Sequence, residues 1–232
     1  MRHQGFQYIF SSFLAASLLF ASISMAKSKQ SSANQRIMDI ISGIQTSVTD
    51  THYSHVTRVN PRQGKYHFDC SGMAVWILKR SAPGALESLG RPNDRRPLAV
   101  HFYQKIARIP PGEKRGPWYR IPSAAHIQPG DIIAWKRPQW FNSTSTGHVA
   151  FAVDTPRTNH GEVSGILVKV ADASKFKHEN DSRSEITTGF GTGTLLLPTD
   201  RQGQPLGYGW IGSETPPEWI IPASLVIGRA LR

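Results

Sequence analysis

The single cysteine of the chain lies where a loop passes into an expected helix. Cys70 follows Asp69 and precedes Ser71 and Gly72, and residues 73–80 favour a helix. Asp and Ser are good N-cap residues. A thiol at a helix N-terminus lies at the positive end of the helix dipole, which favours the thiolate. The position suits a nucleophile, although a small buried hydrophobic side chain is an equally ordinary use of a lone cysteine.

A cysteine nucleophile needs a base within hydrogen-bonding reach and a third group that orients the base. His148 opens an expected strand, 147–153, in which alternation places it on one face with two alanines, leaving the larger Val and Phe for the core. If this strand forms an antiparallel hairpin with 166–172 through a connection at 155–165, His148 lies opposite Asp172. The carboxylate would then fix the imidazole tautomer and stabilise the imidazolium.

This pairing is one chosen register, in which Ala152 faces Val168 and Ala150 faces Val170. A slip of one residue would separate the two polar groups. His178 is the alternative third member, and it requires the second strand to run further.

Residues 1–26 have the pattern of an export signal. A short basic start at Arg2 and His3 precedes an apolar run from Tyr8 to Ile23, and Ser24-Met25-Ala26 offers small residues for cleavage. No other apolar stretch is long enough to span a bilayer. The alternative is an uncleaved anchor, but the run is short and interrupted by serines. We therefore expect an exported protein, periplasmic or extracellular, without an integral membrane segment after cleavage.

Composition narrows the class of partner. The chain has 232 residues, with 27 Lys and Arg against 16 Asp and Glu, giving a formal charge of +11. An exported basic protein meets anionic cell-envelope polymers rather than nucleic acid. One cysteine cannot form an internal disulfide, so an unpaired thiol in an oxidising compartment is either buried or kept for its reactivity. We expect a monomer.

The apolar pattern along the rest of the chain predicts helices in the first half and strands in the second half. Apolar spacing predicts helices at 34–48, 71–81 and around 98–106, whereas 49–67 and 82–97 read as loops. Strands are expected at 118–121, 132–135, 147–153, 166–172, 194–197, 207–212 and 224–231. Residues 27–48 would form a polar segment and helix, and 49–232 the main domain.

Three sequence elements together resemble a known family. They are Asp69-Cys70-Ser71-Gly72 entering a helix, then 130–135 (Gly-Asp-Ile-Ile-Ala-Trp), then Gly147-His148-Val149. In this order they resemble the NlpC-type cell-wall cysteine peptidases of the papain-like superfamily, with the CHAP amidases as a neighbouring branch. The resemblance covers roughly residues 50–175.

The resemblance implies both a fold and an activity. The fold would be α+β, an antiparallel sheet or half-barrel packed against the helix that carries the nucleophile. Cys70 would be the nucleophile, His148 the base and Asp172 the third residue, a position where the family usually has His, Asn or Gln. The reaction implied is hydrolysis of amide bonds in peptidoglycan stem peptides, by an endopeptidase or an amidase, without a cofactor.

Candidate substrate contacts lie beside the nucleophile. Asp69 and Ser71 flank Cys70, and helix capping is the expected role for at least one of them. Tyr53 is the nearest counterpart of the family's upstream tyrosine, although Ser54-His55-Val56 replaces the usual glycine pair.

Other functions fit parts of the pattern. His52-x-x-His55 and His67-x-x-Cys70 have the spacing of metal ligands, but no HExxH motif is present. The same fold could also serve as a catalytically silent cell-envelope binding protein, or transfer acyl groups on another substrate, such as a lipid or a protein amide.

Overall fold

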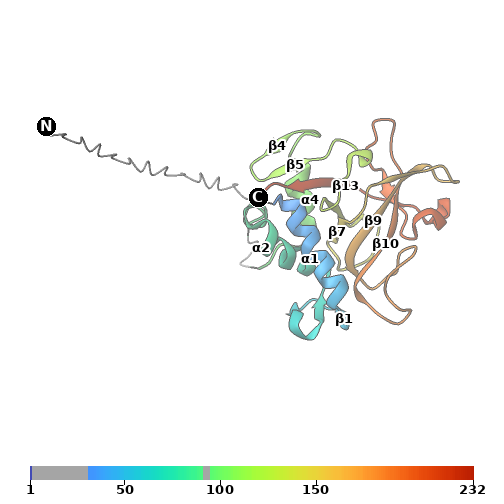
Figure 1. Ribbon diagram of the computed structural model, residues 1–232. Helices are drawn as coiled ribbons and strands as arrows, with labels where there is room; N and C mark the ends of the chain where they lie inside the picture. Colours follow the sequence, from blue (N-terminus) through green and yellow to red (C-terminus); the bar gives the residue numbers. More distant parts are fainter. Residues whose placement is uncertain (2–30, 91–94) are drawn as a thin grey trace. The chain divides into compact units, whose positions relative to one another are not determined.

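The computed structural model describes residues 31–90 and 95–232, together with Met1 (Figure 1). The expected export signal therefore falls outside the described residues, apart from Met1. Residues Ser31–Arg232 form one compact unit, which includes the helix expected at 34–48. The helices of this unit are α1 (Ala33–Ser47), α2 (Cys70–Ser81), α3 (Pro83–Glu87) and α4 (Ala99–Ala107), with short 3-10 turns at Pro61–Gln63, Ala124–His126, Gly212–Glu214 and Pro217–Trp219.

The strands form one large sheet and two small ones. The large sheet has the order β10-β9-β7-β6-β13-β5-β4, β8 also pairs with β9, and every pairing in it is antiparallel. Its strands are β4 (Lys114–Arg115), β5 (Trp118–Arg120), β6 (Ile132–Lys136), β7 (Gly147–Ala152), β8 (Arg157–Asn159), β9 (Gly165–Ser174), β10 (Gly189–Leu197) and β13 (Leu225–Ala230). The small sheets are β1 (Asp50–Tyr53), β3 (Lys65–Phe68) and β2 (Arg58–Asn60), and β11 (Gly207–Tyr208) with β12 (Ile221–Pro222). The fold is thus α+β with a mainly antiparallel sheet.

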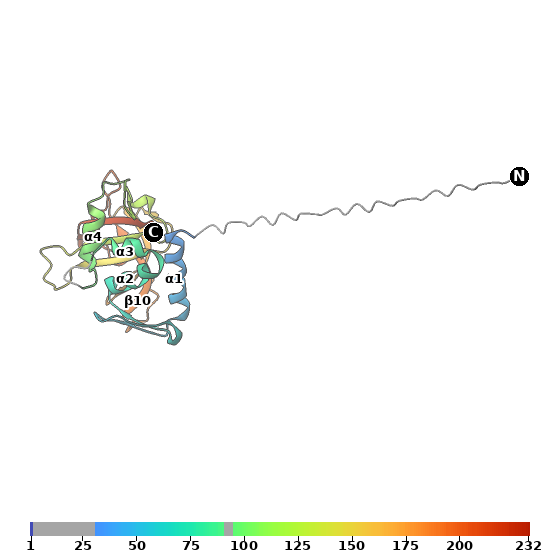
Figure 2. The ribbon, with the colours of Figure 1, turned by 90° about the vertical axis from the view of Figure 1, so that its left-hand side faces the viewer.

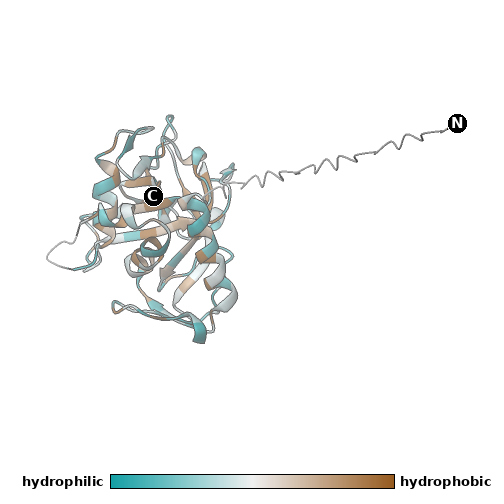
Figure 3. Ribbon diagram, turned by 60° about the vertical axis from the view of Figure 1, so that its left-hand side comes forward, coloured by the Kyte–Doolittle hydropathy of each residue, from teal (hydrophilic) through white to brown (hydrophobic). Residues whose placement is uncertain are grey.

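The helices cover one face of the large sheet, and Figure 2 shows α1 to α4 in front of the strands. Helix α1 buries Ile37, Ile41 and Ile44 in the same hydrophobic cluster as Val149 and Phe151 of β7. Each fully buried side chain of this size contributes roughly 1.5–3 kcal/mol to stability. The apolar spacing that predicted α1 is therefore the spacing that holds it on the sheet, and Figure 3 shows the hydrophobic residues concentrated in the helices and central strands.

The opposite face of the sheet is also buried, which corrects one expectation. Only the face with the larger Val and Phe was assigned to the core, and Ala150 and Ala152 were placed on the other face. They lie instead in a second hydrophobic cluster with Trp135 and Tyr208. The alanines are small because the bulky rings from β6 and β11 pack over them.

A buried ion pair joins the two ends of the described fold. Asp131, which is fully buried, accepts hydrogen bonds from Nε and Nη2 of Arg229, at 2.7 and 2.8 Å, and from Asn34 at 3.1 Å. Gly130 precedes it with φ +90°, and a Cβ there would lie 2.9 Å from Asn34. The Gly130-Asp131 pair is thus a structural clamp between α1, the turn before β6, and β13.

Two segments expected to be loops contain regular structure. Residues 49–67 contain β1, β2 and part of β3. Exposure does alternate along β1 and β3, but each strand has only four residues, too few for a clear period in the sequence. Pro83 starts α3 because proline suits the first position of a helix, while it forces Ala82 out of helical geometry (φ −149°) and ends α2.

Strand β10 is longer than expected, because the glycines in its first half made the sequence there look unlike a strand. Only 194–197 was expected, whereas β10 begins at Gly189 and is buried along its whole length. Glycine is disfavoured in strands, but here alternate glycines make room for neighbouring side chains. A Cβ on Gly191 would lie 2.4 Å from Arg183, and one on Gly193 would lie 2.5 Å from His178.

These contacts predict a stability difference between two Gly→Ala substitutions. Gly193→Ala should lower the free energy of unfolding by roughly 1–3 kcal/mol, because the new methyl group overpacks against His178. The matched control is Gly43→Ala in α1, where nothing lies within 4 Å and alanine should stabilise by about 0.5–1 kcal/mol. Urea unfolding measures both, and equal effects of the two substitutions would contradict the packing described for β10.

Candidate active site

Helix α2 places Cys70 at its first turn. Asp69 is the N-cap, with extended backbone (φ −90°, ψ 177°), and its Oδ1 accepts the amide of Gly72 at 2.7 Å. Cys70 is therefore the first residue of the helix, and its residue exposure is 6 %. It belongs to neither hydrophobic cluster. The thiol is thus buried and lies at the positive end of the helix dipole.

The carboxylate of Asp69 is occupied by internal partners. Its Oδ2 accepts from Arg96 at 2.6 Å and lies 3.0 Å from Nδ1 of His55, while Ser71 donates to Oδ1 at 3.1 Å. Burial would raise the pKa of Asp69, but the hydrogen bonds from His55 and Gly72 and the charge of Arg96 outweigh it and lower the pKa.

Ser71 is built into the same network. It is buried, and its hydroxyl also accepts from Arg96 at 2.7 Å. Of the two roles considered for Asp69 and Ser71, the geometry shows capping and bracing of the nucleophile helix. Their polar atoms are turned toward Arg96 rather than toward a substrate. Arg96 was not singled out in the sequence, because nothing in its local pattern indicates a partner 27 residues away.

His148 and Asp172 meet from neighbouring strands. The Nε2 of His148 lies 2.7 Å from Oδ2 of Asp172, whose side chain is fully buried, while that of His148 is 12 % exposed. Burial alone would lower the pKa of His148. The negative charge of the Cys70 thiolate and hydrogen bonds with Asp172 and Cys70 outweigh burial and raise the pKa to about 10. The carboxylate thus holds Nε2 of His148, and Nδ1 remains available for another partner.

The register that predicted this contact was wrong by two residues. β7 pairs with β9 through Phe151↔Ala171 and Ala152↔Val170, so that Asp172 continues opposite Ala150 instead of His148. The connection expected at 155–165 is shorter in the structure, because residues 157–159 form β8 and also pair with β9.

The contact survives because of the periodicity of a strand. A shift of two residues keeps a side chain on the same face, and a diagonal neighbour is within reach of a long side chain. His148 therefore still touches Asp172, although it is not directly opposite.

His178 lies behind the carboxylate rather than in its place. Its Nε2 is 3.0 Å from the same Oδ2 of Asp172, and its Nδ1 is 3.1 Å from the carbonyl oxygen of Trp210. Both partners are hydrogen-bond acceptors, so both bonds form only when both ring nitrogens carry protons. No neutral tautomer of His178 can donate to both acceptors, and the row of groups reads Cys70, His148, Asp172, His178.

A buried arginine completes the charge balance. Arg183 lies 3.7 Å from Oδ1 of Asp172 and forms an ion pair with Asp181. Within the described part of the chain, Oδ1 of Asp172 has no hydrogen-bond partner, so this longer contact is its main polar interaction. Burial would raise the pKa of Asp172, but the charge of His178 and the hydrogen bonds from both histidines lower it far below its usual value. In this cluster the carboxylates of Asp172 and Asp181 face the guanidinium of Arg183, and Asp172 also faces the rings of His148 and His178.

Aromatic rings enclose the row of polar groups. The ring of Trp135 lies 4.9 Å from that of His148, and Trp210 lies 5.4 Å from His148 and 4.6 Å from His178. Phe176 extends this wall at 6.1 Å from Trp210. The strand expected at 207–212 is wrong beyond Tyr208, and Trp210 lies in the turn that follows it. Phe176 lies in an irregular segment, and neither ring was predicted to be part of the site. The rings shield the ion pairs from water and so strengthen them.

Tyr53 lies beside the nucleophile, at the end of β1. Burial raises the pKa of its hydroxyl, and the negative charges of Cys70 and Asp69 raise it further. The ammonium group of Lys175 lies 5.3 Å from the ring centre. The hydroxyl is therefore a neutral hydrogen-bond donor close to the sulfur.

The histidines of the metal alternative face different partners. His67 lies 2.7 Å from Asp50, whereas His55 bonds Asp69, and the rings of His52 and His67 are 5.9 Å apart. In the described ranges, no three His, Cys, Asp or Glu side chains come together as metal ligands.

The shared carboxylate predicts the effect of removing its charge. Asp172→Asn should lower the free energy of unfolding by roughly 3–5 kcal/mol, because it removes the buried carboxylate that His148 and His178 share. It should also lower the pKa of His148, because a neutral amide stabilises the imidazolium less than the carboxylate does. Urea unfolding and NMR titration of His148 measure the two effects.

The control for this substitution is Asp154→Asn in an exposed loop, which should change neither quantity. His178→Gln keeps a donor toward Asp172 and should weaken turnover only in part. If His178→Gln abolishes turnover while Asp172→Asn preserves it, the residue that orients the base is His178.

Comparisons with known proteins give limited context for this geometry. No protein-family model matches the chain, and no solved structure matches it. An uncharacterized protein of Acanthamoeba polyphaga mimivirus is 28 % identical over 159 residues, which cover 61 % of this chain and 67 % of the viral protein. None of the helices in the described residues is long and apolar enough to cross a membrane.

Proposed function

We propose that the protein is a cysteine hydrolase that cleaves amide bonds by acyl transfer. The observation that carries this proposal is the convergence of Cys70, His148 and Asp172 from α2, β7 and β9, with His148 bonded to Asp172 and its pKa raised by Cys70. A nucleophile, a base and a group that orients the base are the parts this chemistry requires. The papain-like arrangement expected from the sequence is part of the same proposal.

The electrostatics support an ion pair between Cys70 and His148. With a pKa of about 10, the imidazole holds its proton at neutral pH, and the negative sulfur beside it is one cause of that value. Such strongly shifted groups in a polar cluster are typical of catalytic sites. The wall formed by Trp135 and Trp210 maintains the pair by excluding water.

The reaction would proceed in two acyl-transfer steps. The Cys70 thiolate attacks the amide carbonyl carbon and forms a tetrahedral oxyanion. This intermediate collapses as His148 donates its Nδ1 proton to the leaving amine, giving a thioester and a neutral imidazole. His148 then takes a proton from water, whose oxygen attacks the thioester, and the sulfur leaves as the thiolate while the acid product departs.

The start of α2 offers donors for the oxyanion. The first amides of a helix have no partner within it, and these include the N–H groups of Cys70 and Ser71. Gly72, the next amide, is already bonded to Asp69. The neutral hydroxyl of Tyr53 is a second candidate donor, and this would be its contact with substrate.

The substrate proposed is the stem peptide of peptidoglycan. Three features support it: the sequence elements that resemble NlpC-type peptidases, the signal-like residues 1–26, and the formal charge of +11, which suits an anionic envelope polymer. The proposed setting is outside the cytoplasmic membrane, periplasmic or extracellular.

Removal of the nucleophile should abolish hydrolysis. Cys70→Ala and His148→Ala should each release no peptide or amino-sugar product from purified muropeptides, as measured by mass spectrometry beside the wild type. Circular dichroism should show a retained fold for Cys70→Ala. The matched control is His126→Ala, an exposed histidine bonded to Ser123, which should keep full turnover. Wild-type turnover by Cys70→Ala would refute the assignment.

The ion pair predicts how thiol alkylation depends on pH. In the wild type, the rate of reaction with iodoacetamide should change less than about tenfold between pH 6 and pH 9, because the imidazolium maintains the thiolate in acid. In His148→Ala the same rate should rise about two hundredfold, as for an ordinary thiol. An ordinary profile in the wild type would show an inert thiol and favour a silent binding protein.

A further inference from the structure

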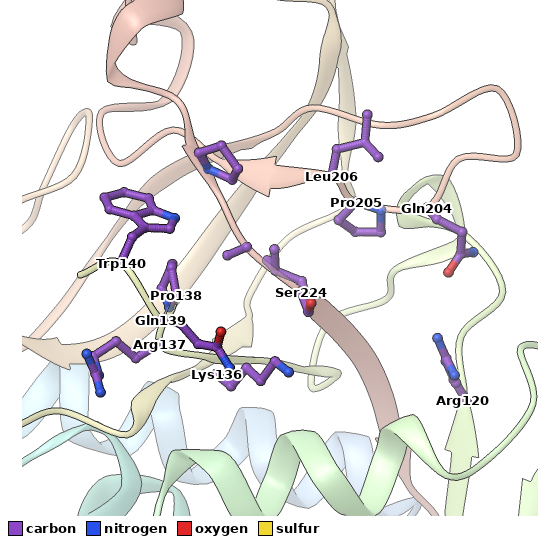
Figure 4. Close-up of a pocket in the computed structure, with 13 residues that line it drawn as sticks. Arg120, Lys136, Arg137, Pro138, Gln139, Trp140, Gln204, Pro205, Leu206 and Ser224 are labelled. Carbon is purple, nitrogen blue, oxygen red and sulfur yellow. The ribbon is translucent and has the colours of Figure 1, made fainter.

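A concave site lies at the C-terminal end of β6, and Cys70 does not line it. It is a cavity of about 860 Å³ between the loop that follows β6 and the segments around 205 and 223 (Figure 4). The residues that define its chemistry are Arg120, Lys136, Arg137, Trp140, Gln204 and Leu206. None of the residues proposed for catalysis lines it.

The cavity carries positive charge without acidic neighbours. Three of its lining residues are basic and none is Asp or Glu. Within the described residues, Arg120, Lys136 and Arg137 belong to none of the ion pairs. The walls would therefore attract an anion and repel a cation.

Arg120 is the strongest indication of an anionic ligand. Its half-buried guanidinium donates to the carbonyl oxygens of Ala107 and Ile109, at 3.1 and 3.0 Å, and burial lowers its pKa. A buried charge is normally compensated by a counter-charge. The two carbonyls bind only one nitrogen, Nη1, so the other guanidinium nitrogens can bind a carboxylate from the cavity.

The rim of the cavity presents a flat apolar surface beside these charges. Trp140 is 65 % exposed, and its ring meets that of Phe141 edge to face at 5.8 Å. Arg137 donates to the carbonyl oxygen of Phe141, which holds the loop against the rim. A saccharide ring combines an apolar C–H face, which an indole can cover, with hydroxyl and carboxylate groups at its edge, which the basic residues and Gln204 can bind.

We propose that this cavity binds a carboxylate-bearing sugar unit of an anionic polysaccharide. Trp140 covers the sugar face, while Arg120, Lys136 and Arg137 bind the carboxylate and neighbouring hydroxyls. The site shares β6 with the candidate active site, since Trp135 pairs with His148 and the next residue, Lys136, lines the cavity. Binding here does not depend on the proposed hydrolysis.

The test uses the full chain and defined oligosaccharides. Isothermal titration calorimetry should show binding of hexagalacturonate that weakens with added salt, and much weaker binding of neutral chitohexaose. Trp140→Ala and Lys136→Gln should each weaken hexagalacturonate binding about tenfold. Binding should persist in Cys70→Ala, so failure of the hydrolase proposal would leave this result unchanged.

Matched controls separate the cavity from general surface attraction. Trp219 is 61 % exposed and Lys169 is exposed, and neither lines the cavity. Trp219→Ala and Lys169→Gln should bind like the wild type. The proposal is overturned if hexagalacturonate does not bind, if poly-glutamate or chitohexaose binds equally well, or if the cavity variants and the controls lose the same affinity.

Discussion

A single buried carboxylate organises the candidate active site. One oxygen of Asp172 is shared by His148 and His178, and the other faces Arg183. An isolated buried charge would be very unfavourable, so each of these cations is also a condition for keeping the carboxylate ionised. The strand order places β7 beside β9, and the glycines of β10 leave space for the side chains of His178 and Arg183. Trp210 provides the carbonyl oxygen that is the second acceptor for His178, and its ring shields the charges from water.

Local sequence patterns predicted a helix or strand correctly where the reason for its residue types lay within that element. The spacing of isoleucines predicted α1, and a cap residue with an apolar run predicted α2. Alternation also placed His148 and Asp172 on one face of the sheet, and this part of the inference held even though the register was wrong by two residues. The period of a strand is short enough that an even error in register preserves its faces.

The rest depended on contacts that no local pattern encodes. Arg96 braces the nucleophile helix from another segment, and Trp210 reaches the histidines through an irregular turn. In the sequence the glycines of β10 indicate a loop. In the fold the side chains of Arg183 and His178 fill the space beside them. In each case the reason for the residue type lies in a partner that only the folded chain brings near.

The order of these residues along the chain has a consequence for when the thiol becomes reactive. Cys70 is synthesised early, whereas His148, Asp172 and His178 all follow it, and the strand that closes over them, β10, follows later still. Pairing between distant segments is slow, because the entropy of closing a long loop is lost before the contacts form. In a growing chain Cys70 thus lacks these partners until the later strands have paired, so that the proposed ion pair belongs to the completed fold alone.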